Sequence, residues 1–189
     1  LPASLDPSPY TTVDSYIDAL TATARSQGRD RYFTYITSIA QENAFFSSGA
    51  TAGFGVRFAY QGNRLFVIET FENAPALTAG IDRGTEILAI GTSESNLVPV
   101  SDIIAAQGSA GISSALGPNT VGTTRVLRIT NAGGTRNVTI AKADYNIDPL
   151  SSRYGVKVID DGGRKVGYIN MRTFISTADN QLRTAFADF

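Results

Sequence analysis

Hydrophobic and polar residues alternate most clearly between residues 53 and 91, where the pattern predicts three strands and one short helix. The three strand-like runs cover residues 56–60, 65–68 and 86–90. Pro75 at a first helical position and Gly80 just past the end predict a short helix between the second and third runs. We therefore expect strand, turn, strand, short helix and strand, in that order.

On both sides of this stretch, apolar residues recur at the spacing of an α-helix. Thr11 and Asp14 form a possible capping box at the start of the first helix, and Gly49 has the place of a C-cap after the second. The predicted helices cover residues 11–28, 38–49, 99–108, 112–116 and 177–189. Two hairpins are predicted, at 125–140 and 155–171, and residues 31–36 are a short strand or loop.

Composition narrows the possible chemistry. The chain has 189 residues, 42% of them hydrophobic and 17% charged, with a formal net charge of −1, so nothing suggests a nucleic-acid partner. It contains neither cysteine nor histidine, which excludes disulfides, thiolate or imidazole metal ligands, and Ser-His-Asp catalysis from these residues. No apolar run is long enough to span a membrane. We expect no metal and no cofactor.

Two glycines, Gly53 and Gly55, flank Phe54 immediately before the first predicted strand. Glycine admits backbone conformations closed to other residues, so successive N–H groups in this turn can converge on an anion. An anion site beside an open strand edge can bind the C-terminus of a peptide as an added strand. The alternative is a plain turn or β-bulge pair of glycines, with no binding role.

Residues 73–91 (NAPALTAGIDRGTEILAIG), following Gly53-Phe54-Gly55, resemble the PDZ domain of the carboxyl-terminal processing, or tail-specific, serine peptidases. The chain departs from that family's pattern at Ala74, where serine is frequent, and at Thr85, where aspartate is usual. Both departures fall at turn or cap positions, outside the glycine loop.

The resemblance implies an α+β fold: a PDZ-like, partly open β-barrel or sandwich with two flanking helices. It implies three parts, namely an N-terminal helical region (1–49), a PDZ domain (50–147) and the beginning of a serine-peptidase catalytic domain (148–189). The last predicted helix has an apolar face and reaches Phe189, which we interpret as a sign of truncation.

The resemblance also implies a function, recognition of the C-terminal segments of protein or peptide substrates. The expected peptide-binding residues are Gly53, Phe54, Gly55, Val56, Phe58 and Ile103. The parent protein would be a serine endopeptidase with a lysine base, in the periplasm or cell envelope. Its catalytic residues would lie beyond this chain, so the fragment itself should be inactive. Ser109, within Gly108–Gly111, lacks a lysine in a comparable context, and we assign it no catalytic role.

Two other interpretations stay open at this point. The chain could be a PDZ-type adaptor or scaffold without a protease, which the sequence downstream of residue 189 would decide. It could also be a β-rich domain whose glycines serve only turns. The sequence leaves the oligomeric state open, as well as whether residues 109–124 block the peptide groove.

Overall fold

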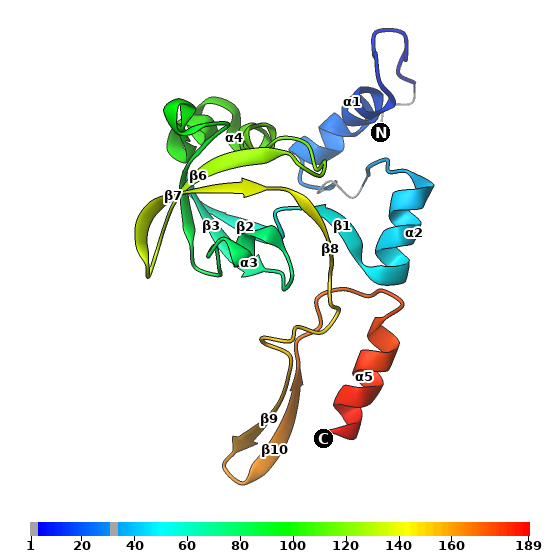
Figure 1. Ribbon diagram of the computed structural model, residues 1–189. Helices are drawn as coiled ribbons and strands as arrows, with labels where there is room; N and C mark the ends of the chain where they lie inside the picture. The colour runs from blue at the N-terminus through cyan, green and yellow to red at the C-terminus, as the bar shows by residue number, and fades with distance from the viewer. Residues whose placement is uncertain (1–3, 31–33) are drawn as a thin grey trace. The chain divides into compact units, whose positions relative to one another are not determined.

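The computed structural model describes residues 4–30 and 34–189 (Figure 1). The chain divides into two compact units, Leu1–Glu42 and Asn43–Phe189. The three-part division at residues 49 and 147 stays a prediction. In the described residues no helix is both long and apolar enough to cross a membrane.

The first unit contains helix α1, Val13–Ser26. Its predicted capping box is wrong by one residue, because Thr12 is extended (φ −135°, ψ 155°) and the helix begins after it. Thr12 Oγ1 accepts a hydrogen bond from the Ser15 N–H at 3.1 Å, and the Thr12 N–H donates to Ser15 Oγ at 3.3 Å. Residues 31–33, part of the predicted strand or loop at 31–36, lie outside the described residues.

Helix α2, Ile39–Ser48, begins in the first unit and ends in the second. The Gly49 N–H donates to Phe45 O at 2.7 Å, and Gly49 has a φ of +71°. The predicted glycine stop is therefore confirmed.

The second unit is built on an antiparallel sheet with the strand order β2-β3-β4-β6-β7, and the short β5 pairs with β4. The strands are β2 (Val56–Gln61), β3 (Arg64–Thr70), β4 (Glu86–Gly91), β5 (Val98–Pro99), β6 (Thr124–Asn131) and β7 (Gly134–Ala141). Helix α3, Pro75–Thr78, follows β3, and the 3-10 turn η1, Glu94–Asn96, follows β4. Among the described residues β2 pairs only with β3, so its outer edge is open.

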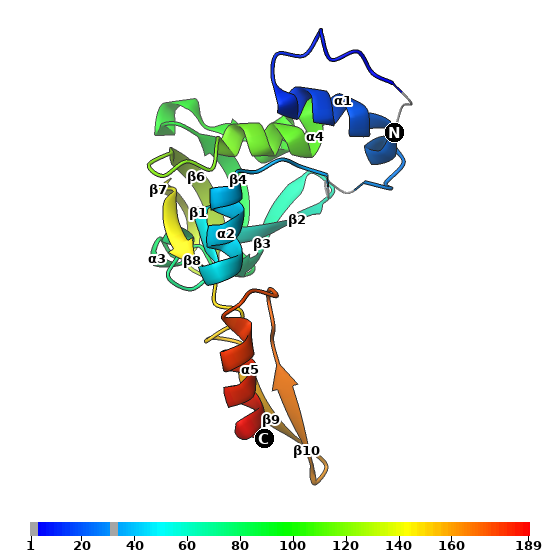
Figure 2. The same ribbon diagram turned by 90° about the vertical axis from the view of Figure 1, so that its right-hand side faces the viewer.

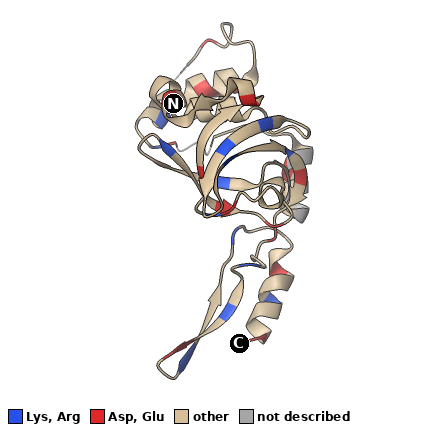
Figure 3. Ribbon diagram, turned by 60° about the vertical axis from the view of Figure 1, so that its left-hand side comes forward, with Lys and Arg blue, Asp and Glu red and all other residues tan. Residues whose placement is uncertain are grey.

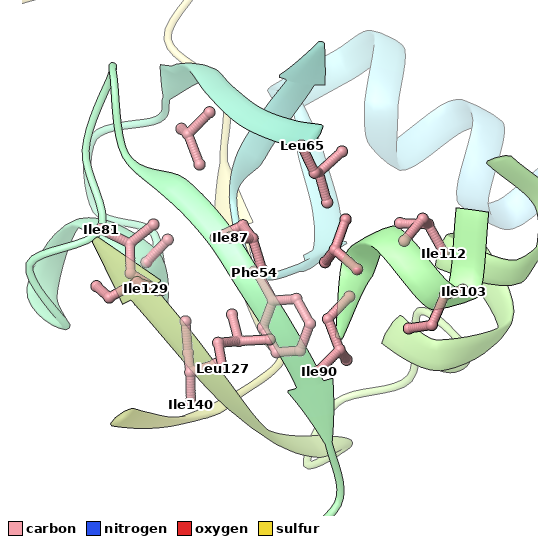
Figure 4. Close-up of a cluster of buried hydrophobic side chains, with 13 residues drawn as sticks. Phe54, Leu65, Ile81, Ile87, Ile90, Ile103, Ile112, Leu127, Ile129 and Ile140 are labelled. Carbon is pink, nitrogen blue, oxygen red and sulfur yellow. The ribbon is translucent and has the colours of Figure 1, made fainter. Parts of the chain in front are cut away.

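Helix α4, Val100–Leu116, packs on strands β3, β4 and β5 (Figure 2). Gly108 interrupts it with non-helical angles (φ 64°, ψ −152°), which confirms the predicted break and the second helical segment beyond it. Side chains from α4 and the sheet form one hydrophobic core. Figure 4 shows its members, including Phe54, Leu65, Ile87, Ile90, Ile103, Ile112, Leu127, Ile129 and Ile140. The predicted α+β class, with an open sheet and two flanking helices, is confirmed.

Strand β1, Ala50–Gly53, pairs with β8, Ala143–Asn146, in a two-stranded antiparallel ribbon that the hydrophobic pattern did not predict. The predicted C-terminal hairpin and helix are confirmed as β9 (Val156–Asp161), β10 (Arg164–Ile169) and α5 (Ala178–Ala187). Every residue of β9 is exposed, and β10 is its strand partner. The ring of Phe189 lies against Gly167 of β10.

A polar network ties the loop after β3 to residues 151–172. Glu72, only 8% exposed, accepts hydrogen bonds from Ser151 Oγ at 2.8 Å and from Arg172 Nη2 at 2.9 Å. Arg172 also forms an ion pair with Glu69 at 2.7 Å. Burial raises the pKa of Glu72, but the hydrogen bonds from Arg172 and Ser151 outweigh it, and the pKa falls to about 2.

Candidate functional site

In the loop between β1 and β2 two carbonyl groups accept hydrogen bonds, whereas two N–H groups donate none within the described residues. The Ala76 N–H donates to Phe54 O at 2.9 Å, and the Phe71 N–H donates to Gly55 O at 2.9 Å. Neither the Phe54 nor the Gly55 N–H donates a hydrogen bond to any described residue. Because unpaired backbone donors are costly away from water, these two N–H groups are suited to donate hydrogen bonds to a bound ligand.

Gly55 is required at its position by both conformation and space. Its φ is +79°, and a Cβ added there would lie 1.9 Å from the Cβ of Ala74, which is fully buried. The side chain of Phe54 is 6% exposed and anchors the loop in the core (Figure 4). Phe54 and the close approach to Ala74 therefore fix the conformation of this loop against the core.

A cavity of about 490 Å³ lies beside this loop, a volume within the usual range for ligand pockets. Strand β2 contributes Val56 and Phe58 to one wall, and the second half of α4 contributes Ser113 and Leu116 to the other. Residues 117–119 line it as well. The 109–124 segment therefore contributes part of the wall and leaves the cavity free.

The open edge of the sheet belongs to the same strand that lines the cavity. β2 pairs with β3 from Val56 to Gln61, with a register shift between Arg57 and Phe58. The N–H and C=O groups on its outer side have no strand partner among residues 4–30 and 34–189. Such an edge can accept an extended peptide as a further antiparallel strand.

The structure gathers all but one of the predicted peptide-binding residues at this cavity. Gly53, Phe54, Gly55, Val56 and Phe58 line it. Ile103 does not line it. It is 9% exposed, belongs to the core, and borders a separate cavity of about 390 Å³ together with Gln107 and Arg125. The facing wall comes from the later part of α4, because the break at Gly108 redirects that segment.

Two groove residues, Lys142 and Tyr145, had no signal in the sequence pattern. They lie far along the chain from the glycine loop, and the β1–β8 pairing brings their segment to it. Tyr145 stacks on Phe71, with ring centroids 5.9 Å apart. Lys142 is 3% exposed, and its Nζ lies 5.0 Å from the centroid of the Phe54 ring.

Lys142 is the only charged residue among the described residues that line the cavity. Figure 3 shows acidic and basic positions distributed over the helices and strands, without a long run of either sign. Burial lowers the pKa of Lys142, and the positive charge of Arg125 lowers it further. In the described part of the chain no group of three or more metal-ligating side chains is present. The arrangement offers amide donors and a cation to an anionic ligand.

No family model and no curated protein matches this chain. Several solved structures are similar to it. The PDZ domain of a carboxy-terminal protease from Vibrio cholerae, solved in complex with a peptide, is 17% identical with a TM-score of 0.40, over 52% of this chain and 99% of that domain. The photosystem II D1 C-terminal processing protease is 16% identical with a TM-score of 0.46, over 94% of this chain and 47% of that protein.

A putative S41 protease from Bacteroides fragilis is 17% identical with a TM-score of 0.45, over 100% of this chain and 47% of that protein. This chain thus spans about half the length of the two proteases. The similar solved structures are C-terminal processing proteases and PDZ-domain proteins, the classes that the sequence resemblance names.

Proposed function

We propose that the second unit binds the C-terminal end of a peptide in the groove between β2 and α4. One observation carries the proposal. The N–H groups of Phe54 and Gly55, which donate to no described residue, and the open edge of β2 border the same cavity. The terminal carboxylate accepts from these amides, and the preceding residues pair with β2. Charge-assisted hydrogen bonds of this kind are about twice as strong as neutral ones.

The groove also sets a preference for the last side chain of the ligand. Val56, Phe58 and Leu116 present apolar surface to the cavity. Burial of an apolar side chain there contributes about 25 cal/mol per Å² of surface removed from water. Peptides ending in aliphatic or aromatic residues should therefore bind more tightly than those ending in charged residues.

The experiment compares two peptides that differ only at the terminal group, one with a free carboxylate and one amidated. Loss of a charge-assisted hydrogen bond should weaken binding about tenfold or more, measured by fluorescence anisotropy with labelled peptide. Equal affinity for the two peptides would overturn the proposal.

We further propose that the whole protein is a carboxyl-terminal processing serine endopeptidase of the Ser-Lys type, located in the periplasm or cell envelope. The resemblance of residues 73–91 to that family's PDZ domain supports this. The chain alone should then cleave no peptide, because the nucleophile and base lie outside it. A coding sequence that continues past residue 189 with a serine and a lysine in the family's motifs is the expected observation. A stop there would favour the adaptor.

A further inference from the structure

Lys142 is a buried cation without an acidic partner. It is 3% exposed, and no carboxylate pairs with it anywhere in residues 4–30 and 34–189. Buried charges in proteins are normally paired, because an isolated one loses its hydration without compensation. The question is therefore what stabilises a buried ammonium group that has no carboxylate partner in the described part of the chain.

Its hydrogen bonds are satisfied by neutral groups. Nζ donates to Gly117 O at 2.6 Å, to Pro118 O at 2.9 Å and to Asn119 Oδ1 at 2.9 Å. All three acceptors belong to the segment after α4 that lines the cavity. These bonds use the three donors of the ammonium, so Lys142 fixes this wall without a carboxylate partner among the described residues.

The position of that charge relates it to the glycine loop. Nζ lies 5.0 Å from the centroid of the Phe54 ring, and the main chain of Gly53, Phe54 and Gly55 borders the cavity that Lys142 lines. In the low effective dielectric of a partly buried site, a cation in the cavity wall favours a bound anion over a neutral group of the same shape.

Resting on the proposed function, we infer that Lys142 is the residue that makes the groove select a negatively charged chain end over a neutral one. The ammonium acts through space on the carboxylate, while its hydrogen bonds hold residues 117–119 in position. The ligand class is an anionic peptide C-terminus.

A purely structural role makes a different prediction. Lys142 and Arg125 both donate to carbonyls near the C-terminal end of α4, since Arg125 Nε donates to Ala115 O at 2.6 Å. Cations there stabilise a helix end on their own. If Lys142 does only this, its loss weakens all peptides by the same factor.

The test measures the ratio of Kd for the amidated peptide to Kd for the free-carboxylate peptide, by fluorescence anisotropy on the full chain. Lys142→Gln keeps a hydrogen-bond donor but removes the charge, and should lower this ratio about fivefold or more. Lys142→Arg should keep most of the wild-type ratio. Arg125→Gln, whose side chain lines a different cavity, should lower the ratio less than Lys142→Gln does, and Lys165→Gln on the exposed β10 should leave both affinities unchanged.

A wild-type ratio near one would overturn the proposed function itself. A high wild-type ratio that Lys142→Gln preserves would overturn only the role of Lys142. If Lys142→Gln fails to fold, ¹³Cε-labelled lysine in the wild-type protein gives the same answer. The free-carboxylate peptide should move the titration of Lys142 to higher pH relative to the amidated complex, and identical titrations would contradict the inference.

Discussion

Gly53 and Gly55 flank the same phenylalanine but meet different constraints. Gly55 has a positive φ and lies against buried Ala74, whereas a Cβ at Gly53 would meet its nearest atom, Tyr145 Oη, at 3.7 Å, an ordinary contact. The two positions therefore form a matched pair. A change at Gly55 disturbs the fold, and a change at Gly53 probes the groove wall with the fold intact.

We predict that Gly55→Ala lowers the free energy of unfolding by about 2–4 kcal/mol, from backbone strain plus a steric clash. Gly53→Ala should change it by less than about 1 kcal/mol. Urea unfolding followed by circular dichroism measures both. A Gly55→Ala variant as stable as wild type would mean that the loop does not adopt this conformation.

Glu72 makes stability depend on pH. Its pKa in the folded protein is about 2, below its ordinary value of 4.5, so the unfolded chain binds a proton more readily than the folded one. The stabilisation from its pairing with Arg172 is complete above about pH 4.5 and is lost as the pH falls towards 2.

Glu72→Gln should lower the free energy of unfolding at neutral pH by about 1–3 kcal/mol and flatten its decline below pH 4.5. Urea unfolding across a pH series measures this. The control is Glu86→Gln, whose partner Arg64 is 54% exposed and whose loss should cost about 1 kcal/mol or less. An unchanged acid slope in Glu72→Gln would show that other carboxylates account for it.

The glycine loop could be predicted from the sequence because the turn and its N–H groups belong to three consecutive residues. Lys142 and Tyr145 could not be predicted, since only the non-local pairing of β1 and β8 places them at the cavity.

The two departures from the resembled family pattern, Ala74 and Thr85, have visible local consequences. Ala74 gives α3 no side-chain cap, whereas Thr85 Oγ1 accepts from the Asp82 N–H at 3.1 Å and so retains a turn bond.

Elements with strong local signals were predicted well. The sheet strands, the hairpins and the break at Gly108 follow hydrophobic period, turn residues and glycine, which are properties of neighbouring residues. The β1–β8 ribbon was missed because its strands are four residues long and rich in alanine, glycine, aspartate and asparagine. Their extended form depends on a partner remote in sequence.

The β9–β10 hairpin should be the least protected strand pair of the second unit. A two-stranded hairpin with little packing is marginally stable in water, and Val158 and Ile159 are 51% and 45% exposed. Hydrogen exchange followed by mass spectrometry should show exchange on the order of a hundredfold faster or more than in β4 and β6. Equal protection would contradict the exposure of this hairpin.

For the whole chain, peptide binding and stability are linked. A ligand that binds only the folded second unit raises its free energy of unfolding by about 2.7 kcal/mol at a concentration of one hundred times Kd. We expect a free-carboxylate peptide with an apolar end to raise the Tm accordingly. The amidated peptide at the same concentration should raise it less, and an equal rise would argue against recognition of the carboxylate.

The β1–β8 ribbon has an engineering consequence. Gly53 faces Ala143 across it, and the Cα atoms of residues facing each other in an antiparallel pair lie only about 4.5–5.5 Å apart. The segment between Gly53 and Ala143 therefore begins and ends at nearly the same place, as a domain inserted into a loop of another protein does. Residues 50–146 should accordingly tolerate transplantation into a surface turn of an unrelated carrier, or new termini at the β6–β7 turn once the original ends are joined.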